Sequence, residues 1–253
     1  MSVGETPLAQ ILDEARRLAG AALERDVPLR LVGGLAIRIR GDEAFHPGLS
    51  REYKDIDFVT LKGRSKQVTS FLQDMGYQPH EQFNALNGHE RLLFHDLRNQ
   101  RQLDVFVGAF RMCHEIPITD RIIHEPMTLP LAELLLTKLQ IISLNEKDLR
   151  DVVAILHHHD VADQDGDTIN ASRVAKLCAE DWGLWRTCKL NFDRVRAGLA
   201  TYDMTPDERA AIEQRLDRLW ERIDAEPKSR GWRLRDRIGD RKRWYEEPEE
   251  VDA

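Results

Sequence analysis

The chain has few cysteines and no long apolar run, and both shortages narrow its class. Its three cysteines, Cys113, Cys178 and Cys188, are odd in number and lack the spacing of a metal site, so no disulfide framework is expected. Because reduced thiols are typical of the cytoplasm, we expect a cytoplasmic protein. No stretch of about 18 apolar residues occurs, which excludes a spanning helix and a membrane partner. The first ten residues also lack the pattern of a signal peptide, so none is expected.

The chain also has no excess of positive charge. The 253 residues carry a net charge of −7, which argues against a wholly basic nucleic-acid-binding protein. Neither GxxxxGK[ST] nor GxGxxG occurs, so P-loop and Rossmann nucleotide sites lose their main support. The remaining composition, 42% hydrophobic and 32% charged, is typical of a globular chain with one large or two smaller domains.

The hydrophobic pattern changes character near residue 128. Before it, helices are predicted over 6–26, 35–40 and 64–75, and strands over 29–32, 56–61, 90–96 and 102–107, with a polar loop at 41–54. After it the spacing is helical, over 131–144, 146–157, 171–181, 184–199, 205–224 and 231–245. We therefore predict an α+β fold. A small mixed or antiparallel sheet domain over 1–128 is followed by a helical domain over 129–253.

The most informative segment is Asp55-Ile56-Asp57, at the start of a predicted strand. The period of two places Asp55 and Asp57 on one face, about 7 Å apart. Two carboxylates this close repel each other unless a cation lies between them. The pair therefore indicates a site for a divalent metal.

A third carboxylate, Asp104, lies within another apolar strand, Gln102–Val107. A strand in the core rarely carries an aspartate that is neither paired nor metal-bound. Three such carboxylates suit two Mg²⁺ ions that act on a phosphate, with Mn²⁺ as an alternative. The other interpretation is structural: Asp55 caps a strand edge, and Asp104 pairs with an arginine, for which Arg38, Arg91 and Arg101 are candidates.

Gly33-Gly34 follows the predicted strand Leu29–Val32 and precedes a helical turn. Glycine there permits a left-handed backbone and a close phosphate approach, with helix N-terminal amides directed at the anion. Taken alone, two adjacent glycines equally indicate a tight turn.

Gly33-Gly34, then Asp55-x-Asp57, then a single strand Asp104 resembles the signature order of the DNA polymerase β-like nucleotidyltransferases. A second block, Leu129–Leu139 followed by Glu146–Val152, is similar to the AbiEii-type members, a group that includes toxins of toxin–antitoxin pairs and enzymes that modify tRNA acceptor ends. The resemblance covers about residues 29–156. It implies that the first domain is catalytic, that Lys138 contacts the nucleotide phosphates, and that Asp148 and Asp151 fill the acidic positions of the last motif.

Two departures from this family stand out. Leu35 occupies the position where serine or threonine commonly follows the glycines, so backbone amides must serve the phosphate there. The interval from Gly34 to Asp55 is also longer than usual, with Asp42–Ser50 as an apparent insertion, which a loop accommodates at little entropic cost.

Basic side chains near these motifs have both functional and structural interpretations. Lys138 lies among leucines on its predicted helix, where it either meets phosphate or reaches the helix margin. Asp148 and Asp151 share a helix face, and either orient Lys138 or Lys147 or form solvated ion pairs. Arg51 either reaches the triphosphate or forms a surface salt bridge.

Two other segments attract attention. His157-His158-His159 is not expected to bind one ion, because consecutive helical side chains point in different directions. Residues 228–245 hold eight Lys/Arg against two Asp, with Trp232, Trp244 and Tyr245 among them. We interpret them as a helix whose tryptophans pack inward, although this is also the best candidate surface for RNA.

The resemblance implies a magnesium-dependent transfer of a nucleoside monophosphate from an NTP, such as ATP, to an acceptor hydroxyl. Asp55, Asp57 and Asp104 hold the metals, Gly33-Gly34 cradle the triphosphate, and Lys138 neutralises it. The acceptor stays open: tRNA or another RNA, an antibiotic or a protein. A toxin would also have an antitoxin protein as partner. The alternatives are an antibiotic adenylyltransferase and a non-catalytic nucleotide- or partner-binding protein.

Overall fold

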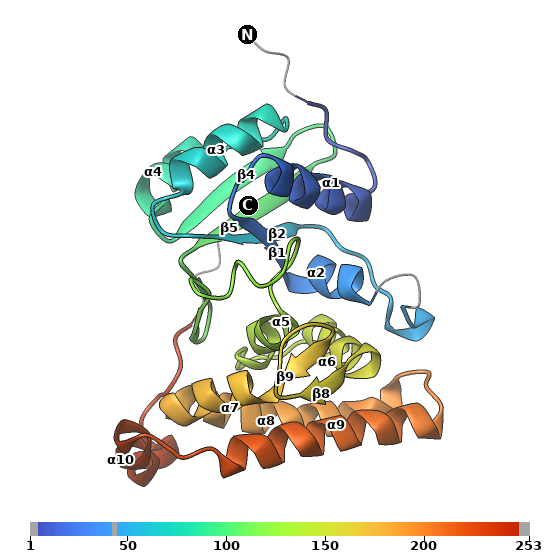
Figure 1. Ribbon diagram of the computed structural model, residues 1–253, viewed down its shortest axis with the longest axis vertical. Helices are drawn as coiled ribbons and strands as arrows, with labels where there is room; N and C mark the ends of the chain where they lie inside the picture. The colour runs from blue at the N-terminus through green and yellow to red at the C-terminus, as the bar shows by residue number, and fades with distance from the viewer. Residues whose placement is uncertain (1–4, 42–44, 248–253) are drawn as a thin grey trace. The chain divides into compact units, whose positions relative to one another are not determined.

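The computed structural model describes residues 5–41 and 45–247, which divide into two compact units (Figure 1). Unit 1 contains the described parts of 1–40, 52–110 and 116–130. Unit 2 contains the described parts of 41–51, 111–115 and 131–253. The main change of unit along the chain therefore falls between Pro130 and Leu131. The apparent insertion Asp42–Ser50 belongs to unit 2, although Asp42–Ala44 lie outside the described residues.

Unit 1 is built on a five-stranded mixed sheet with the order β1-β2-β5-β4-β3. Its strands are β1 (Leu29–Val32), β2 (Ile56–Thr60), β3 (Gln78–Pro79), β4 (Arg91–Asp96) and β5 (Arg101–Val107). Strands β2 and β5 are parallel, and the other neighbouring pairs are antiparallel. A further small pair is formed by β6 (Ala109–Arg111) and β7 (Glu115–Pro117).

The two faces of this sheet differ in polarity. One face carries apolar side chains from the central strands, and Leu31, Phe58 and Leu103 on it are fully buried. The opposite face carries Asp57 and Asp104, because side chains alternate along each strand. Val59 and Leu93 on this second face are also buried, so the two carboxylates lie among apolar side chains.

The helices that accompany the sheet are α1 (Ile11–Glu24), α2 (Gly33–Arg40), α3 (Ser65–Asp74) and α4 (Glu81–Asn87). Figure 1 shows α1 and α3 on the same side of the sheet. Helix α1 begins at Ile11 rather than at residue 6. Thr6 precedes Pro7, and a residue before proline avoids helical dihedrals, which rules out a start at Thr6 itself. Helix α4 was missed by the pattern, since none of its residues is buried and no apolar stripe marks it.

Unit 2 is helical: α5 (Leu131–Leu139), α6 (Glu146–His158), α7 (Ala171–Glu180), α8 (Trp182–Gly198), α9 (Pro206–Ala225) and α10 (Arg230–Ile238). Short 3₁₀ turns occur at η1 (Pro47–Leu49), η2 (Leu199–Thr201) and η3 (Gly239–Arg241), and β8 (Asp160–Ala162) pairs with β9 (Thr168–Asn170). Figure 1 shows α7, α8 and α9 stacked beside one another.

Helix α5 ends earlier than predicted. The side-chain amide of the buried Asn191 donates hydrogen bonds to the carbonyls of Leu139 and Ile141, both at 2.8 Å. These bonds satisfy carbonyls that a continuing helix would have used, so the chain turns at Leu139. The predicted α+β class is confirmed: a small mixed sheet lies in unit 1, and the C-terminal region is helical. Within 5–41 and 45–247, none of the helices combines the length with the hydropathy that a bilayer crossing demands.

Candidate functional site

Asp57 and Asp104 occupy directly partnered positions on neighbouring parallel strands. The register of β2 and β5 sets Asp57 opposite Asp104, with Phe58 opposite Val105. Adjacent strands are about 4.8 Å apart, so both side chains leave the same face at that spacing. Asp104 is 3% exposed, and Asp57 is half-buried. Two carboxylates in this arrangement need a compensating positive charge.

Arg91 supplies positive charge to Asp104. Its Nε donates to Oδ1 of Asp104 at 2.7 Å, and the Gln102 side chain donates to Oδ2 at 2.8 Å. Strand geometry explains both contacts. Leu93 on β4 is the partner of Asp104, so Arg91, two residues earlier, lies diagonally on the same face. Gln102 lies two residues before Asp104 on β5 and therefore also shares that face. The arginine pairing considered as the structural interpretation of Asp104 is therefore present.

Asp55 lies just before β2 and is exposed. The period of two still relates it to Asp57, but it stands outside the hydrogen-bonded strand. Among the described residues, the groups of at least three His, Cys, Asp or Glu with ligand atoms within 4.8 Å of one another do not include Asp55, Asp57 and Asp104. Asp57 and Asp104 share a face of the sheet, and the three carboxylates do not form a compact ligand cluster among the described residues.

The backbone of Gly33 packs directly against the carboxylate of Asp57. Its φ is +69°, and a β-carbon built on it would lie 2.5 Å from Oδ2 of Asp57. Only glycine combines this dihedral with this closeness at low cost. Gly33 and Gly34 begin α2, so the predicted strand–glycine–helix order is observed. Leu35 is 2% exposed, so its side chain belongs to the core.

Lys138, on α5, is held by the two aspartates of α6. Its Nζ lies 2.8 Å from Oδ1 of Asp148 and 3.0 Å from Oδ2 of Asp151. Arg51 completes the cluster with a bidentate contact, from Nε to Oδ1 of Asp151 at 2.9 Å and from Nη2 to Oδ2 at 2.8 Å. The side chains of Lys138 and Asp151 are 12% and 4% exposed. Two cations and two anions thus form a neutral cluster, mostly shielded from water.

Charge pairing outweighs burial for both partners of this cluster. Burial alone would lower the pKa of Lys138, but Asp151 and Asp148 raise it above its ordinary value. Burial would raise the pKa of Asp151, but Lys138 and Arg51 lower it. Both groups therefore stay charged across the neutral range. Two of the three Lys138 N–H donors serve these carboxylates, and the role of Lys138 toward nucleotide phosphates stays a prediction.

The predicted site residues thus form two sets in different units. Gly33, Gly34, Asp55, Asp57 and Asp104 belong to unit 1. Arg51, Lys138, Asp148 and Asp151 belong to unit 2.

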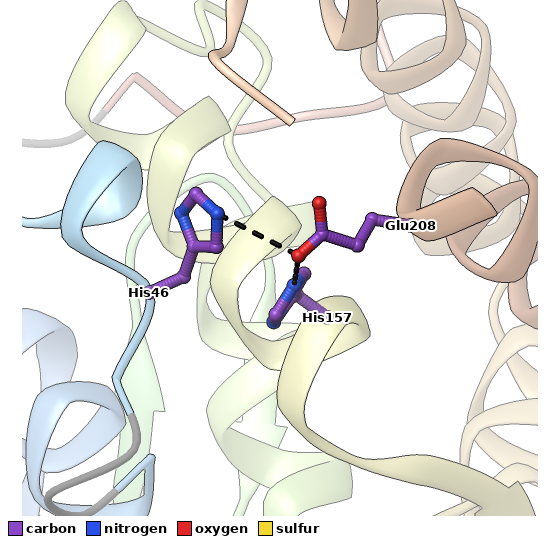
Figure 2. Close-up of side chains that lie close together, drawn as sticks. All are labelled: His46, His157 and Glu208. Atoms are coloured by element: carbon purple, nitrogen blue, oxygen red, sulfur yellow. Dashed lines mark hydrogen bonds and ion pairs between the residues drawn. The ribbon is translucent and has the colours of Figure 1, made fainter. Parts of the chain in front are cut away.

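Sequence reasoning missed one cluster of ligand-type side chains. His46, His157 and Glu208 converge in unit 2 (Figure 2). The histidine run drew attention to His157, but His46 and Glu208 are remote in sequence, and no spacing rule connects them.

The basic and aromatic segment 228–245 packs its tryptophans inward, as interpreted from its sequence. Trp232 is 9% exposed and lies edge-on to Trp185, and the indole N–H of Trp244 donates to the Thr187 hydroxyl at 3.1 Å. Asp236 and Asp240 are engaged by Trp182 and Arg186, respectively. Several basic residues of the segment are exposed: Arg233, Arg237, Arg241, Lys242 and Arg243.

Comparisons with known proteins add no relative to this picture. No family model matches the chain, and the search of curated proteins returned no significant match.

Proposed function

We propose that the chain is a Mg²⁺- or Mn²⁺-dependent nucleotidyltransferase that moves a nucleoside monophosphate from an NTP to an acceptor hydroxyl. The observation that carries this proposal is the partnered position of Asp57 and Asp104, with the backbone of Gly33 against the Asp57 carboxylate. The motif order described above supports the same chemistry.

The residues fit a hard divalent cation. Carboxylate oxygens are its preferred ligands, and Asp57 and Asp104 present theirs from one face of the sheet, with Asp55 two residues before Asp57. A bound cation would neutralise charge at the α-phosphate and favour the ionised acceptor hydroxyl. It would also replace the compensation that Arg91 gives to Asp104, so Arg91 competes for the same Oδ1.

The glycine turn would serve the triphosphate. Gly33 and Gly34 open an eight-residue helix, whose first N–H groups have no partners within the helix itself. Such amides bind phosphate oxygens. A glycine at residue 33 permits the left-handed turn that begins this helix beside the Asp57 carboxylate. Positioning and charge neutralisation account for most of the catalysis in phosphoryl-type transfers.

Among the possible acceptors we favour the end of an RNA, such as that of tRNA. The exposed arginines of 228–245 offer positive charge in a chain that is acidic on average. Transfer to an aminoglycoside would instead favour the antibiotic adenylyltransferase. NTP binding without transfer would favour the non-catalytic alternative. A toxin would in addition arrest growth when expressed, and an antitoxin partner would relieve that arrest.

The test incubates the purified chain with Mg²⁺ and each α-labelled NTP, together with total tRNA, aminoglycosides or no added acceptor. We expect label transfer that falls at least about a hundredfold in Asp57→Asn and Asp104→Asn. Asp74→Asn is the matched control, because Asp74 is an exposed carboxylate that pairs only loosely with Arg25. Equal transfer by Asp57→Asn and the wild type would contradict the proposal.

A further inference from the structure

Three side chains from distant parts of unit 2 point at one place (Figure 2). His46 precedes η1, His157 lies in the last turn of α6, and Glu208 lies in the first turn of α9. Oε1 of Glu208 is 3.1 Å from Nε2 of His157 and 3.6 Å from Nε2 of His46. One ligand atom from each residue lies within 4.8 Å of the other two. The three side chains are only 17%, 18% and 31% exposed, in the order His157, His46, Glu208.

We propose that His46, His157 and Glu208 form a Zn²⁺ site. Two imidazoles and one carboxylate, with a fourth position left for water, are an established donor set for this ion. Ligand atoms about 2.0–2.1 Å from a tetrahedral Zn²⁺ lie about 3.3 Å from each other. The two nitrogen–oxygen distances, 3.1 and 3.6 Å, lie on either side of that value. Small side-chain rotations would therefore admit the ion.

Glu208 is oriented for this role by its helix cap. Its other oxygen, Oε2, accepts hydrogen bonds from the backbone N–H of Thr205 at 2.7 Å and from the Thr205 hydroxyl at 2.8 Å. This capping box leaves Oε1 to the two histidines. Such outer contacts are how proteins fix the direction of a metal-binding carboxylate.

The contacts made by the Nδ1 atoms of the two histidines suit zinc less well than those of Glu208, and they limit the affinity for the ion. Nδ1 of His46 accepts from the N–H of Gly48 at 3.1 Å, so the ring proton resides on Nε2 before an ion binds. Zinc on Nε2 would move that proton to Nδ1, and the bond from Gly48 would have to be released. Nδ1 of His157 is buried and meets no hydrogen-bonding partner among the described residues. We therefore infer an exchangeable zinc site, coupled to movement of the turn Pro47–Leu49, rather than a permanently filled one.

The experiment measures Zn²⁺ binding to the untagged full chain by competition with a chromophoric chelator. We expect one ion per chain, with affinity reduced at least about a hundredfold in His46→Ala, His157→Ala and Glu208→Gln. Glu208→Gln is the sharpest variant, because glutamine also completes a capping box and should preserve the start of α9. Controls are His89→Ala, an exposed histidine of unit 1, and Asp57→Asn, and both should bind zinc as the wild type does.

Two further readouts separate this site from the proposed catalytic one. Millimolar Mg²⁺ should leave zinc binding unchanged, because imidazole is a poor magnesium ligand. Zinc should shift the amide resonance of Gly48, and Co²⁺ should give the visible absorption of a tetrahedral site. Binding weaker than about 10 µM, or equal binding by Glu208→Gln, His157→Ala and the wild type, would overturn the proposal.

Discussion

The carboxylate of Asp57 occupies the space that a side chain on Gly33 would need. A β-carbon at residue 33 would lie 2.5 Å from Oδ2 of Asp57, and Gly33 has a φ of +69°. The first residue of α2 and the second residue of β2 are therefore in direct contact. This contact explains why the glycine and the Asp-x-Asp segment occur together in one sequence.

Replacing Gly33 by alanine should disturb both stability and activity. The left-handed dihedral alone costs about 1–2 kcal/mol for an alanine. The clash adds to that cost and displaces the Asp57 carboxylate. Gly63→Ala is the control, because Gly63 has a φ of +78° but open space around its β-carbon. Urea unfolding should show a larger loss for Gly33→Ala, and nucleotidyl transfer should fall in this variant alone. Equal losses of stability in the two variants would contradict the contact described above.

Arg91 should tune the metal requirement if Asp104 is a ligand. Its guanidinium holds Oδ1 of Asp104, so a cation must compete with it. Arg91→Met should therefore lower the Mg²⁺ concentration at half-maximal transfer, while Asp104→Asn should abolish transfer. The readout is a magnesium titration at saturating NTP, which separates metal affinity from nucleotide affinity. A higher magnesium requirement in Arg91→Met would mean that Arg91 supports the site instead of competing for it.

The Lys138 cluster should stabilise unit 2 in a pH-dependent way. Breaking a buried ion pair by removing one partner costs about 3–5 kcal/mol, which we expect for Lys138→Met at pH 7. Because the folded pKa of Asp151 is lowered, its contribution is present above the unfolded value of about 3.9 and is lost as pH falls through the folded value. The raised pKa of Lys138 acts in the opposite direction. Its contribution is present below about pH 10.4 and is lost as pH rises through the folded value.

Urea unfolding of the wild type and Lys138→Met across this pH range tests the cluster. The exposed Lys147, on the same helix as Asp148, provides the control Lys147→Met, which should change stability by less than about 0.5 kcal/mol. If Lys138→Met unfolds like the wild type yet needs more NTP, a phosphate-binding role would replace the structural one.

The tryptophans and the arginines of 228–245 should respond to mutation differently. Trp232→Ala should cost about 3–5 kcal/mol of stability, because the ring is buried against Trp185. Replacing the exposed Arg233 and Arg237 with alanine should leave stability nearly unchanged. If this segment binds RNA, the double variant should also weaken binding and reduce its salt dependence by about one unit of slope per lost contact. A Trp232→Ala variant as stable as the wild type would contradict the inward-packing interpretation.

Local sequence signals predicted the four longest strands, β1, β2, β4 and β5, but not the short strands β3 and β6–β9. The boundaries of β1 follow from Pro28 and the glycines, and the register that pairs Asp57 with Asp104 is consistent with two short alternating strands. Arg91 could be proposed as a partner of Asp104, but its choice over Arg38 and Arg101 depends on strand register, which the sequence does not display. The convergence of His46 and Glu208 could not be predicted either, since it depends on how the helices pack.

Helix ends were predicted less accurately than the ends of the four long strands, because tertiary contacts decide them. The Asn191 side chain ends α5 by donating hydrogen bonds to the carbonyls of Leu139 and Ile141, and the sequence around Leu139 contains no helix-terminating residue. The parallel pairing of β8 with β9 was not predicted, since each strand has only three residues.

The central claim is tested most directly by the position of the label on the transferred group. With Mg²⁺ and total RNA, the wild type should transfer label from an α-³²P NTP and none from the γ-³²P form, with release of pyrophosphate. Asp57→Asn should transfer neither, while Asp74→Asn should behave as the wild type does. Transfer of the γ-label, or α-label transfer that persists in Asp57→Asn, would contradict a nucleotidyltransferase that depends on these carboxylates.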